Sequence, residues 1–581
     1  MLIFKALACD YDGTLASEDR LGPNALAALG KAREAGLRLI LVTGRTFFEL
    51  TRVCERLDLF DGVVAENGGV LYFPATAVIR ALAPPPPPRF LAELDRRGVS
   101  YQLGRVIVGT ARSAEAAVRA ALGEAGVHFE FVQNRAALMV VPAGISKGSG
   151  VRQMLRLLGL SFHDVLALGD AENDLDLFDA CGWAGCPASA VPELMRRADW
   201  SFPGEDGAAI ARAIVGPILN GLLPLDRSTR HRIDLGWAAA TGETVNIPSR
   251  GINVLVHGDP SSGKSWLAGS LVERLRERRY AVCVIDPEGD YGELAGLPGV
   301  GRAEGHDEAA VDAAFRHFER NPAACVVIDL APLAHARKVK MIERCLLAAR
   351  GMRQQIGLPH WIVLDEAHYS LHRDGVAERA LAIENKGFCL VTYKPSWIRP
   401  SAMRAIDVLI GGRTAAAHEL AFLRSFLTAA GGCSEGVIPA LADLPQGEFL
   451  LMKKETGSTW LASTFTATPR AIPHVRHLRK YADAAVRPEH AFLFRLPDGR
   501  LVATADSLNG FRRIVATAAD AVVAHHAGRG DFSRWIHDVF SDRELAGQLR
   551  KVERRWGRGE IPDLRQVIDE AIAVRYWSEE S

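Results

Sequence analysis

The sequence predicts a multidomain α/β protein: a Rossmann-like core with an α/β cap, a second α/β domain, and a small α+β domain at the C-terminal end. Three observations lead to this prediction. The 581 residues exceed what one hydrophobic core organises. Apolar, strand-like runs alternate with helix-like stretches in two long blocks, as in parallel sheets built from βαβ units. Acidic or glycine-rich segments follow several of these runs, where such sheets place their ligands.

The first block begins with the strand-like runs "FKALACD" and "LRLILVTGR", separated by the helix-like "ALAALGKAREAG". Five consecutive prolines, residues 84–88, form a stiff connector into a second small α/β set. The first pattern then resumes at "ISKGSGVRQMLRLLGL" and "DVLALGDAENDLDLF". We therefore predict a core made of residues 1–79 and 143–220, interrupted by a cap at residues 80–142.

The second block, residues 231–466, repeats the alternation with runs such as "NVLVHG", "AVCVID", "HWIVLDEAH" and "FCLVTY". A different pattern follows from about residue 470. In the predicted C-terminal domain, residues 485–581, "HAFLFRLPDGRLVAT" carries an Asp-Gly pair typical of a hairpin turn, and helix-like stretches follow it.

The composition favours no particular class of partner. The 69 basic and 69 acidic residues cancel, which gives no overall attraction to nucleic acid or to an acidic surface. There is no run long and apolar enough for a membrane span, and Asp10 comes too early for a signal peptide. The nine cysteines lack metal-binding spacing. We expect a soluble, cytoplasmic protein with buried thiols and no membrane partner.

Two carboxylates, Asp10 and Asp12, directly follow the first apolar run in "CDYDGTL". Paired carboxylates at a strand end fit either a shared divalent cation or a division into nucleophile and acid/base. Three later pieces fit the same centre: Thr43 ends the next strand, Lys147 lies in "GISKGSG", and Asp170 ends the strand of "VLALGDAENDLDLF".

In this order, the four pieces resemble the motifs of the haloacid dehalogenase superfamily, in particular its type IIB, Cof-like phosphatases, over roughly residues 3–215. The resemblance implies that Asp10 attacks phosphorus and forms an aspartyl-phosphate. Asp12 would protonate the leaving alcohol and then activate water. Thr43 and Lys147 would bind the phosphoryl oxygens.

The resemblance also implies a Mg²⁺ cofactor. Asp170, the Asp10 carboxylate and the Asp12 backbone carbonyl would hold the ion, and Asp174 with Asn173 would support them. The substrate would be a small phosphorylated metabolite, a sugar phosphate or a phosphoglycolate-like acid. In the cap, "FEFVQNRAALMVV" offers Gln133, Asn134 and Arg135 as polar candidates, which are as readily ordinary loop residues.

The run "GDPSSGKS" fits the phosphate-binding pattern GxxxxGK[ST] between a strand and a helix, so backbone N–H groups and the helix N-terminus face a nucleotide's phosphates. Lys264 would reach the β- and γ-phosphates of ATP, and Ser265 would hold Mg²⁺. In "HWIVLDEAH", Asp365 would hold the hydrated Mg²⁺ and Glu366 would orient the attacking water. The predicted ATP-binding loop comprises Gly258, Asp259, Pro260, Ser261, Ser262, Gly263, Lys264 and Ser265.

With "TGETVNIP" before the loop and "LVTYKPSWI" after the acidic pair, residues 231–466 resemble HerA/FtsK-type P-loop ATPases, which include ring-forming, typically hexameric DNA motors. One departure is Tyr393, which stands where the group usually carries a glutamine that senses phosphate. A tyrosine cannot make the same amide contact, so hydrolysis would be slow or triggered differently. Arg413 in "IGGRT" is a candidate arginine finger acting across a subunit boundary, or a surface ion-pair residue.

The segment "PHVRHLRKY", residues 473–481, combines basic and aromatic side chains. A solvated connector is the favoured interpretation, and a nucleic-acid contact is the alternative. His525, His526 and His537 do not have the spacing that specifies a metal site.

Three interpretations of the whole chain remain. The leading one is a bifunctional enzyme, a Mg²⁺-dependent phosphatase fused to an ATP-hydrolysing P-loop domain. The second is a nucleic-acid translocating ATPase, a homo-oligomer such as a hexamer, with an accessory phosphatase. The third is an ATP-regulated phosphatase whose P-loop domain is a sensor, which Tyr393 favours.

Overall fold

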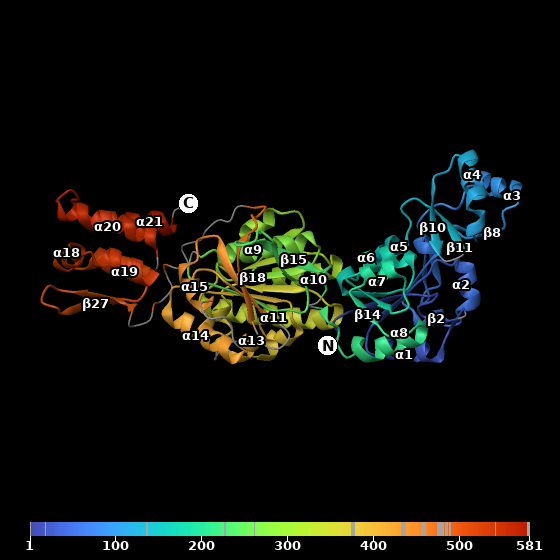
Figure 1. The fold of residues 1–581 in the computed structure, drawn as a ribbon. Coiled ribbons are helices and arrows are strands. Elements are labelled where there is room, and N and C mark those ends of the chain that lie inside the picture. The colour runs from blue at the N-terminus through green and yellow to red at the C-terminus, as the bar shows by residue number, and fades with distance from the viewer. Residues whose placement is uncertain are drawn as a thin grey trace.

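The structure is a computed structural model, shown in Figure 1. Three sheet-containing regions follow one another along the chain, and the N-terminus lies where the first meets the second (Figure 1). The structure describes residues 2–577 except 18, 135–136, 226–227, 261, 373–377, 432–436, 455–459, 473–481, 483–485, 487–489 and 541.

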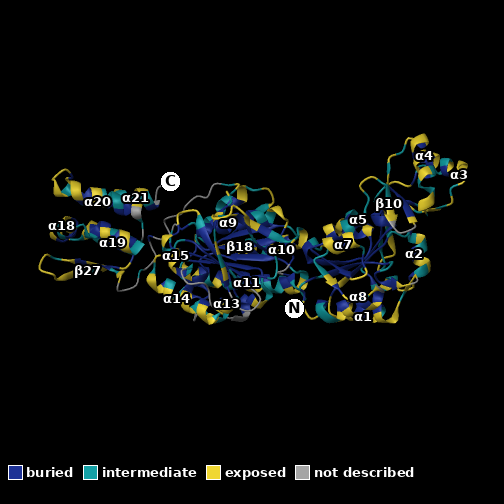
Figure 2. Cartoon of the chain, in the orientation of Figure 1, coloured by how far each residue is buried: buried dark blue, intermediate teal, exposed yellow. Residues whose placement is uncertain are grey.

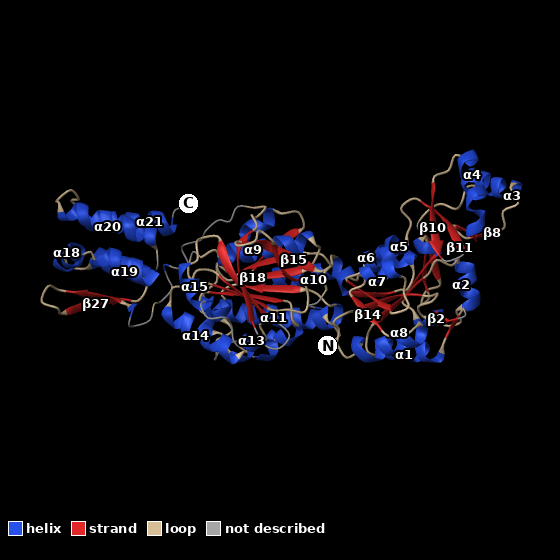
Figure 3. Cartoon of the chain, viewed as in Figure 1, coloured by secondary structure: helices blue, strands red, loops and turns tan. Residues whose placement is uncertain are grey.

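The first region is built on an eight-stranded sheet whose central strand, β1, lies between β12 and β4. Six strands are parallel, and β6 and β7 extend the sheet as an antiparallel hairpin. The central strands are buried on both faces because helices cover both (Figures 2 and 3). In sheet order the strands are β14 (Trp200–Phe202), β13 (Trp183–Pro187), β12 (Val165–Leu168), β1 (Ala6–Asp10), β4 (Arg38–Val42), β5 (Gly62–Ala65), β6 (Val70–Phe73) and β7 (Val78–Ala81).

The connections of this sheet are mostly helical. A two-stranded pair, β2 (Ala16–Ser17) and β3 (Arg20–Leu21), follows β1. The helices are α1 (Pro23–Glu34), α2 (Phe47–Val53), α5 (Lys147–Leu158), α6 (Leu175–Ala180), α7 (Pro192–Arg197) and α8 (Asp206–Ala213).

A separate four-stranded antiparallel sheet is inserted between β7 and α5. Its own small core is formed by apolar residues that include Phe90, Leu94, Val118 and Val140. In sheet order it contains β10 (Phe129–Asn134), β11 (Ala137–Pro142), β9 (Val108–Ala111) and β8 (Tyr101–Leu103), covered by α3 (Pro88–Arg96) and α4 (Glu115–Ala125).

The second region has an eleven-stranded sheet, in which seven parallel strands from β23 to β19 are extended by four antiparallel ones. In sheet order the strands are β16 (Thr244–Pro248), β15 (Arg232–Ala238), β25 (Trp460–Ala467), β24 (Glu448–Lys454), β23 (Val408–Gly411), β17 (Val254–His257), β22 (Phe388–Thr392), β21 (Trp361–Leu364), β18 (Val282–Asp286), β20 (Cys325–Asp329) and β19 (Val300–Glu304). The helices are α9 (Lys264–Glu277), α10 (Glu308–Arg320), α11 (His335–Ile356), α12 (Glu378–Leu381), α13 (Pro400–Arg404), α14 (Ala417–Ala429) and α15 (Val437–Asp443).

The third region consists of the antiparallel hairpin β26 (Phe492–Arg495) and β27 (Leu501–Ala505), packed with helices around an aromatic core. Gly499 takes a φ of 88° in the hairpin loop, a left-handed conformation that glycine adopts without strain. The helices are α17 (Leu508–Thr517), α18 (Asp520–Arg529), α19 (Asp531–Phe540), α20 (Arg543–Gly557) and α21 (Leu564–Trp577). The predicted multidomain α/β class with a small α+β end is confirmed.

Direct contacts join the first two regions. Asp164, which precedes β12, accepts a hydrogen bond from Arg250 at 2.9 Å and lies 3.2 Å from Nε2 of His360. The ring of His163 stacks on Tyr280 with centroids 3.6 Å apart, and its Nε2 lies 2.8 Å from the Arg278 carbonyl oxygen. His163, Asp164, Tyr280 and His360 are buried, and their contacts hold the two sheets together.

Eight cysteines among the described residues are buried and free, in keeping with the expected buried thiols. None of the described helices is long and apolar enough to cross a membrane.

The interface should weaken in acid. Burial lowers the pKa of His163 and of His360 below the usual value near 6.5. As the pH falls, the unfolded chain therefore binds protons at these histidines at a higher pH than the folded chain does. The contribution of the two neutral histidines to the free energy of unfolding is present above pH ~6.5 and is lost as the pH falls below it. His163→Phe keeps a ring against Tyr280 and should reduce the fall in Tm between pH 7.5 and 5.5, measured by calorimetry. The exposed His317→Phe should keep the wild-type slope. An unchanged slope in His163→Phe would contradict the assignment.

Candidate functional sites

The first site lies at the carboxyl end of β1. Asp10 is the last residue of this strand, flanked by Val42 at the end of β4 and by the end of β12. Four preceding residues, "ALAC", are fully apolar and buried, which fixes the strand in the centre of the sheet. The Asp10 carboxylate is thereby held within the fold rather than in solvent.

Lys147 joins Asp10 to Asp174. Its Nζ lies 2.6 Å from Oδ1 of Asp10 and 2.6 Å from Oδ1 of Asp174, although the Lys147 side chain is only 1% exposed. The position of Lys147 follows from local structure: it is the first residue of α5, which is capped by Ser146 and Ser149 in a reciprocal capping box. Burial lowers the pKa of Lys147, but the charges of Asp10 and Asp174 outweigh it and raise the pKa above its usual range.

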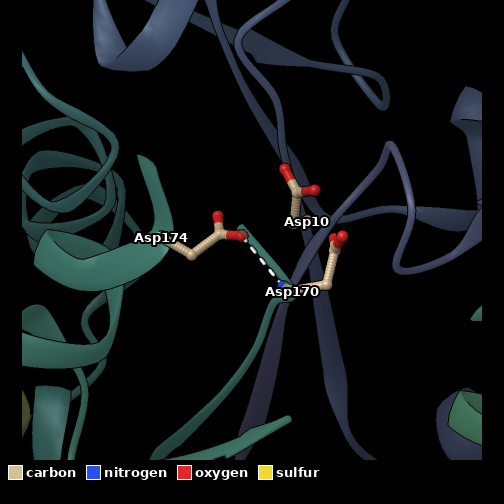
Figure 4. A group of neighbouring side chains, drawn as sticks. All are labelled: Asp10, Asp170 and Asp174. Atoms are coloured by element: carbon tan, nitrogen blue, oxygen red, sulfur yellow. Dashed lines mark hydrogen bonds between the residues drawn. The ribbon is translucent and has the colours of Figure 1, made fainter. Parts of the chain in front are cut away.

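Asp10, Asp170 and Asp174 form a buried group whose nearest oxygens all lie within 4.8 Å of one another (Figure 4). Asp174 accepts from the backbone N–H of Asp170 at 3.1 Å, and Thr14 donates to Oδ1 of Asp170 at 2.7 Å. Burial and then the charge of Asp174 raise the pKa of Asp10 well above its usual value. Lys147 supplies one positive charge against three carboxylates, so this oxygen donor set fits a divalent cation such as Mg²⁺.

Asp12 stands apart from this group. Its carboxylate accepts from Nε of Arg45 at 2.9 Å through both oxygens, and Arg45 also contacts Asp19. Arg45 follows Thr43 in the loop after β4, and its role was not foreseen from the sequence, although "VTGR" contains it. The feature of the sequence that could have indicated Arg45 is its position two residues after Thr43.

Thr43 is buried at the end of β4, and its hydroxyl accepts from the Arg45 N–H at 3.1 Å. Asn173 is also buried, and both polar atoms of its amide lack a hydrogen-bond partner among the described residues. Met139 of the inserted sheet lies over Gly44, where an added Cβ would stand 2.7 Å from its sulfur. The inserted sheet therefore covers this site with an apolar side chain.

Of the three polar candidates in the cap, the structure describes the side chain of Gln133 alone, and it contacts another part of the cap. Gln133 donates to Glu115 of α4 at 3.1 Å, on the exposed side. The side chain of Asn134, and Arg135, lie outside the described residues. Glu66 connects the eight-stranded sheet to the inserted region. Its carboxylate accepts hydrogen bonds from the N–H groups of Arg105 at 2.9 Å and Val106 at 2.8 Å.

The second site surrounds the loop between β17 and α9. Lys264 is buried and donates to the carbonyl oxygen of Asp259 at 2.9 Å, so it folds back over its own loop. Gly263 has a φ of 94°, in the left-handed region, and an added Cβ would stand 3.1 Å from Phe449. Gly258, Pro260 and Ser262 complete the described part of the predicted loop, and Ser261 lies outside the described residues.

Asp290 contacts this loop, and the sequence did not predict this acidic residue as part of the site. Ser265 donates to Oδ2 of Asp290 at 2.9 Å. Asp290 is held there by Asp286, whose carboxylate accepts from four successive N–H groups after β18. Burial and the charge of Asp290 raise the pKa of Asp286 to about 7. The signal was present in "IDPEGDY", where two acids follow a strand.

The predicted acidic pair lies at the end of β21, separated from β17 by β22 alone. Asp365 and Glu366 are both buried, and Glu366 adopts a left-handed φ of 43°, a strained conformation found most often at functional sites. Nδ1 of the buried His368 lies 3.4 Å from Oε2 of Glu366 and 3.0 Å from Oγ1 of Thr392. His368 therefore connects the acidic pair to the end of β22.

Tyr393, the residue that replaces the expected glutamine, packs edge-on against His368 with centroids 4.8 Å apart. Nζ of Lys394 lies 4.9 Å from the Tyr393 ring and 4.0 Å from the ring of Trp397. Arg413 follows β23, and its carbonyl oxygen accepts from the N–H of Asp259 at 2.8 Å. Arg413 thus lies beside the loop of its own chain.

Two further sequence features carry no site in the described part of the chain. The basic run at residues 473–481 lies outside the described residues. His526 is held by Asp531 at 2.9 Å and accepts from the Arg495 N–H at 2.8 Å. Among the described residues, the one metal-like cluster is that of Asp10, so His525, His526 and His537 form none.

The fold and the two sites define the class: a hydrolase with a Rossmann-like core and a buried acidic centre, followed by a P-loop domain. Residues 7–85 and 114–214 match the haloacid dehalogenase-like hydrolase family, and residues 255–354 match the central domain of helicase HerA. The chain therefore contains a haloacid dehalogenase-like hydrolase domain and, later in the chain, a HerA central domain. Both resemblances predicted from the motifs are confirmed.

Each of the following relatives matches about a third of this chain. The chain is 32% identical over 220 residues to a phosphoglycolate phosphatase of Methanothermobacter thermautotrophicus, covering 36% of this chain and 97% of that protein. It is 31% identical over 204 residues to a phosphoglycolate phosphatase of Haloarcula marismortui, covering 33% of this chain and 88% of that protein. A solved haloacid dehalogenase-like hydrolase from Bacteroides thetaiotaomicron is 18% identical with a TM-score of 0.33, covering 36% of this chain and 98% of that chain.

Arg45→Ala should impair the first site by releasing Asp12. If Asp12 protonates the leaving group, kcat for an alkyl phosphate should fall about 10²-fold, in the range seen when an acid/base group is lost. Turnover of p-nitrophenyl phosphate, whose leaving group needs no proton, should fall far less. Arg56→Ala, on an exposed pair with Asp58, is the matched control. Equal losses for the two substrates would contradict this role.

If the second site hydrolyses ATP, His368→Ala should slow that hydrolysis about tenfold or more without weakening ATP binding, because it removes the ring whose Nδ1 lies 3.4 Å from Oε2 of Glu366. His368→Asn, which retains a hydrogen-bonding nitrogen near Nδ1, should recover part of kcat. The measurements are steady-state ATPase kinetics and ATP affinity by calorimetry. A loss of affinity with unchanged kcat would show that His368 acts on binding instead.

Proposed function

We propose that this protein is a bifunctional enzyme: a Mg²⁺-dependent phosphatase of small phosphorylated metabolites, joined to a domain that binds and hydrolyses ATP. The observation that carries the phosphatase assignment is the buried Lys147 between Asp10 and Asp174. The similarity to phosphoglycolate phosphatases supports a small organic phosphate, phosphoglycolate-like or a sugar phosphate, as substrate. The proposed division is a core at 1–79 and 143–220, a cap at 80–142, an ATPase domain at 231–466 and an accessory domain at 485–581.

In the proposed reaction, the Asp10 carboxylate attacks phosphorus and forms an aspartyl-phosphate while the bond to the leaving oxygen breaks. Asp12, which Arg45 positions as a carboxylate, takes up a proton from solvent before the reaction and gives it to the leaving alcohol. It then takes a proton from the water that attacks the phosphoryl group, which releases phosphate and restores Asp10. Lys147 holds Oδ1 of Asp10 and offsets charge on the phosphoryl oxygens, which Thr43 and the Asn173 amide also contact.

The carboxylates of Asp10, Asp170 and Asp174 and the backbone carbonyl of Asp12 are the proposed holders of Mg²⁺. When bound, the ion neutralises charge on the phosphoryl group and its nucleophile. Thr14 orients Asp170, and the backbone N–H of Asp170 orients Asp174. The inserted sheet, with Met139 over Gly44, limits the room available, which favours small substrates over proteins.

For the second centre, the proposed nucleotide is ATP, with its phosphates on the N–H groups of the loop and on Lys264. Ser265 and Asp365, together with Asp290, are the proposed holders of its Mg²⁺. Glu366 orients the attacking water, and His368 orients Glu366. Because Arg413 lies beside the loop of its own chain, we propose that it acts there in cis rather than across a subunit boundary.

The match to the HerA central domain favours a second candidate, a nucleic-acid translocating ATPase, hexameric if motor-like, with an accessory phosphatase. The direct contacts of Asp164 with Arg250 and His360 favour a third, in which ATP occupancy regulates the phosphatase. Both candidates use the same two centres. In the second candidate ATP drives movement along nucleic acid, and in the third it regulates the phosphatase.

The test compares the wild type with Asp10→Asn and Lys264→Ala, measuring phosphate release from a metabolite panel and from ATP, with and without DNA. We expect Asp10→Asn to abolish metabolite hydrolysis and keep ATP hydrolysis, and Lys264→Ala to do the reverse. Metabolite hydrolysis that survives Asp10→Asn would refute the phosphatase assignment. ATP hydrolysis that survives Lys264→Ala would refute the second centre.

The same assay separates the candidates. DNA-stimulated ATP hydrolysis by a ring-shaped oligomer would select the motor. A phosphatase rate that changes with ATP, and loses this change in Lys264→Ala, would select the regulated phosphatase.

A further inference from the structure

A cavity in the C-terminal domain is unconnected with either phosphate centre. It has a volume of about 490 Å³ and lies between the end of α18, one face of α19 and one face of α20. This is within the size range of small-ligand sites. The charged residues that line it are Arg529, Arg534, His537, Asp538, Arg550, Glu553 and Arg554.

Glu553 forms the buried side of this cavity and is 6% exposed. Its Oε1 accepts from the N–H groups of Phe532 at 3.0 Å and Ser533 at 3.2 Å, at the start of α19. Its Oε2 is shielded from solvent and has no hydrogen bond of good geometry among the described residues; the Ser533 hydroxyl, which also stabilises the Glu553 carboxylate, donates to the Gly530 carbonyl at 3.3 Å. A buried carboxylate oxygen without a donor costs free energy, and a ligand donor would remove that cost.

Four arginines line the same cavity as this carboxylate. Arg550 and Arg554 are one helical turn apart on α20, on either side of Glu553, and neither forms an ion pair among the described residues. Arg529 and Arg534 share Asp531, each at 3.4 Å. The exposed side chains of Arg550 and Arg554 are free to move when a ligand enters toward Oε2. The cavity thus pairs an acceptor within the fold with cationic groups at its mouth.

We propose that this cavity binds a cytosine nucleotide, with the exocyclic amino group of the base on Glu553 and the phosphate on Arg550 and Arg554. Carboxylates accept hydrogen bonds from the amino group of cytosine, and guanidinium groups bind phosphate and stack on planar bases. An inorganic anion satisfies the arginines but not Glu553, whereas a nucleotide satisfies both. The nucleotide is either a free one or a unit of a single strand.

The test is calorimetric titration of the full chain carrying Asp10→Asn and Lys264→Ala, in EDTA, so that neither phosphate centre contributes. CMP and UMP are the matched probes, because they differ in an amino donor against a carbonyl acceptor. We expect CMP to bind about tenfold or more tightly than UMP.

Glu553→Gln is the decisive variant. Its amide oxygen can still accept from Phe532 and Ser533, which preserves the start of α19, while its NH₂ replaces Oε2 and turns an acceptor into a donor. The preference should then move toward UMP. Replacing Arg550 and Arg554 together with alanine should weaken both probes alike. Arg555→Ala, on an exposed pair with Glu560, should change neither.

Three results would overturn the proposal: no binding of CMP, equal affinity for CMP and UMP, or an unchanged preference in a folded Glu553→Gln variant. Glucose 6-phosphate binding as tightly as CMP would equally exclude a nucleotide site. Titration with short oligo(dC) and oligo(dT) distinguishes the two sources, since a preference seen only in the oligonucleotides assigns the site to a single strand.

Discussion

The burial of the Lys147 ammonium group is the constraint on which the first site depends. An ammonium group removed from water is stable only beside negative charge, and Asp10 and Asp174 supply it at 2.6 Å each. Lys147 must therefore begin α5 at the carboxyl edge of the sheet, between strands that are distant in sequence. The close approach of Gly68, where a Cβ would stand 1.9 Å from the Ser146 carbonyl oxygen, fixes the start of that helix.

Both centres use the carboxyl edge of a parallel sheet, but they use it differently. In the reaction proposed for the first, Asp10 attacks phosphorus, and the polar groups around it neutralise charge. In the reaction proposed for the second, Lys264 binds phosphates and Glu366 orients water, and none of the described side chains is assigned a nucleophilic role. The two centres therefore divide the chemistry, and Asp164, Arg250 and His360 hold their sheets together.

The sequence predicted the strands whose C-terminal ends carry the candidate functional residues. Asp10, Asp170 and the pair Asp365 and Glu366 follow apolar runs, and the strand ends they mark are those of β1, β12 and β21. It did not predict partners that come from a neighbouring strand or loop, such as Asp290 for Ser265 and His368 for Glu366. Strand order decides these pairs, and periodicity carries no information on strand order. Arg45 was missed for the same reason, since its contact with Asp12 joins two loops.

The central claim is that ester cleavage proceeds through a covalent bond to Asp10. Rapid quenching of the wild type with ³²P-labelled substrate, followed by peptide mapping, measures this directly. The account predicts acid-stable label on the peptide containing Asp10, in the wild type and in Lys264→Ala but not in Asp10→Asn. Turnover without any labelled Asp10 peptide, under conditions that trap acyl-phosphates, would contradict it.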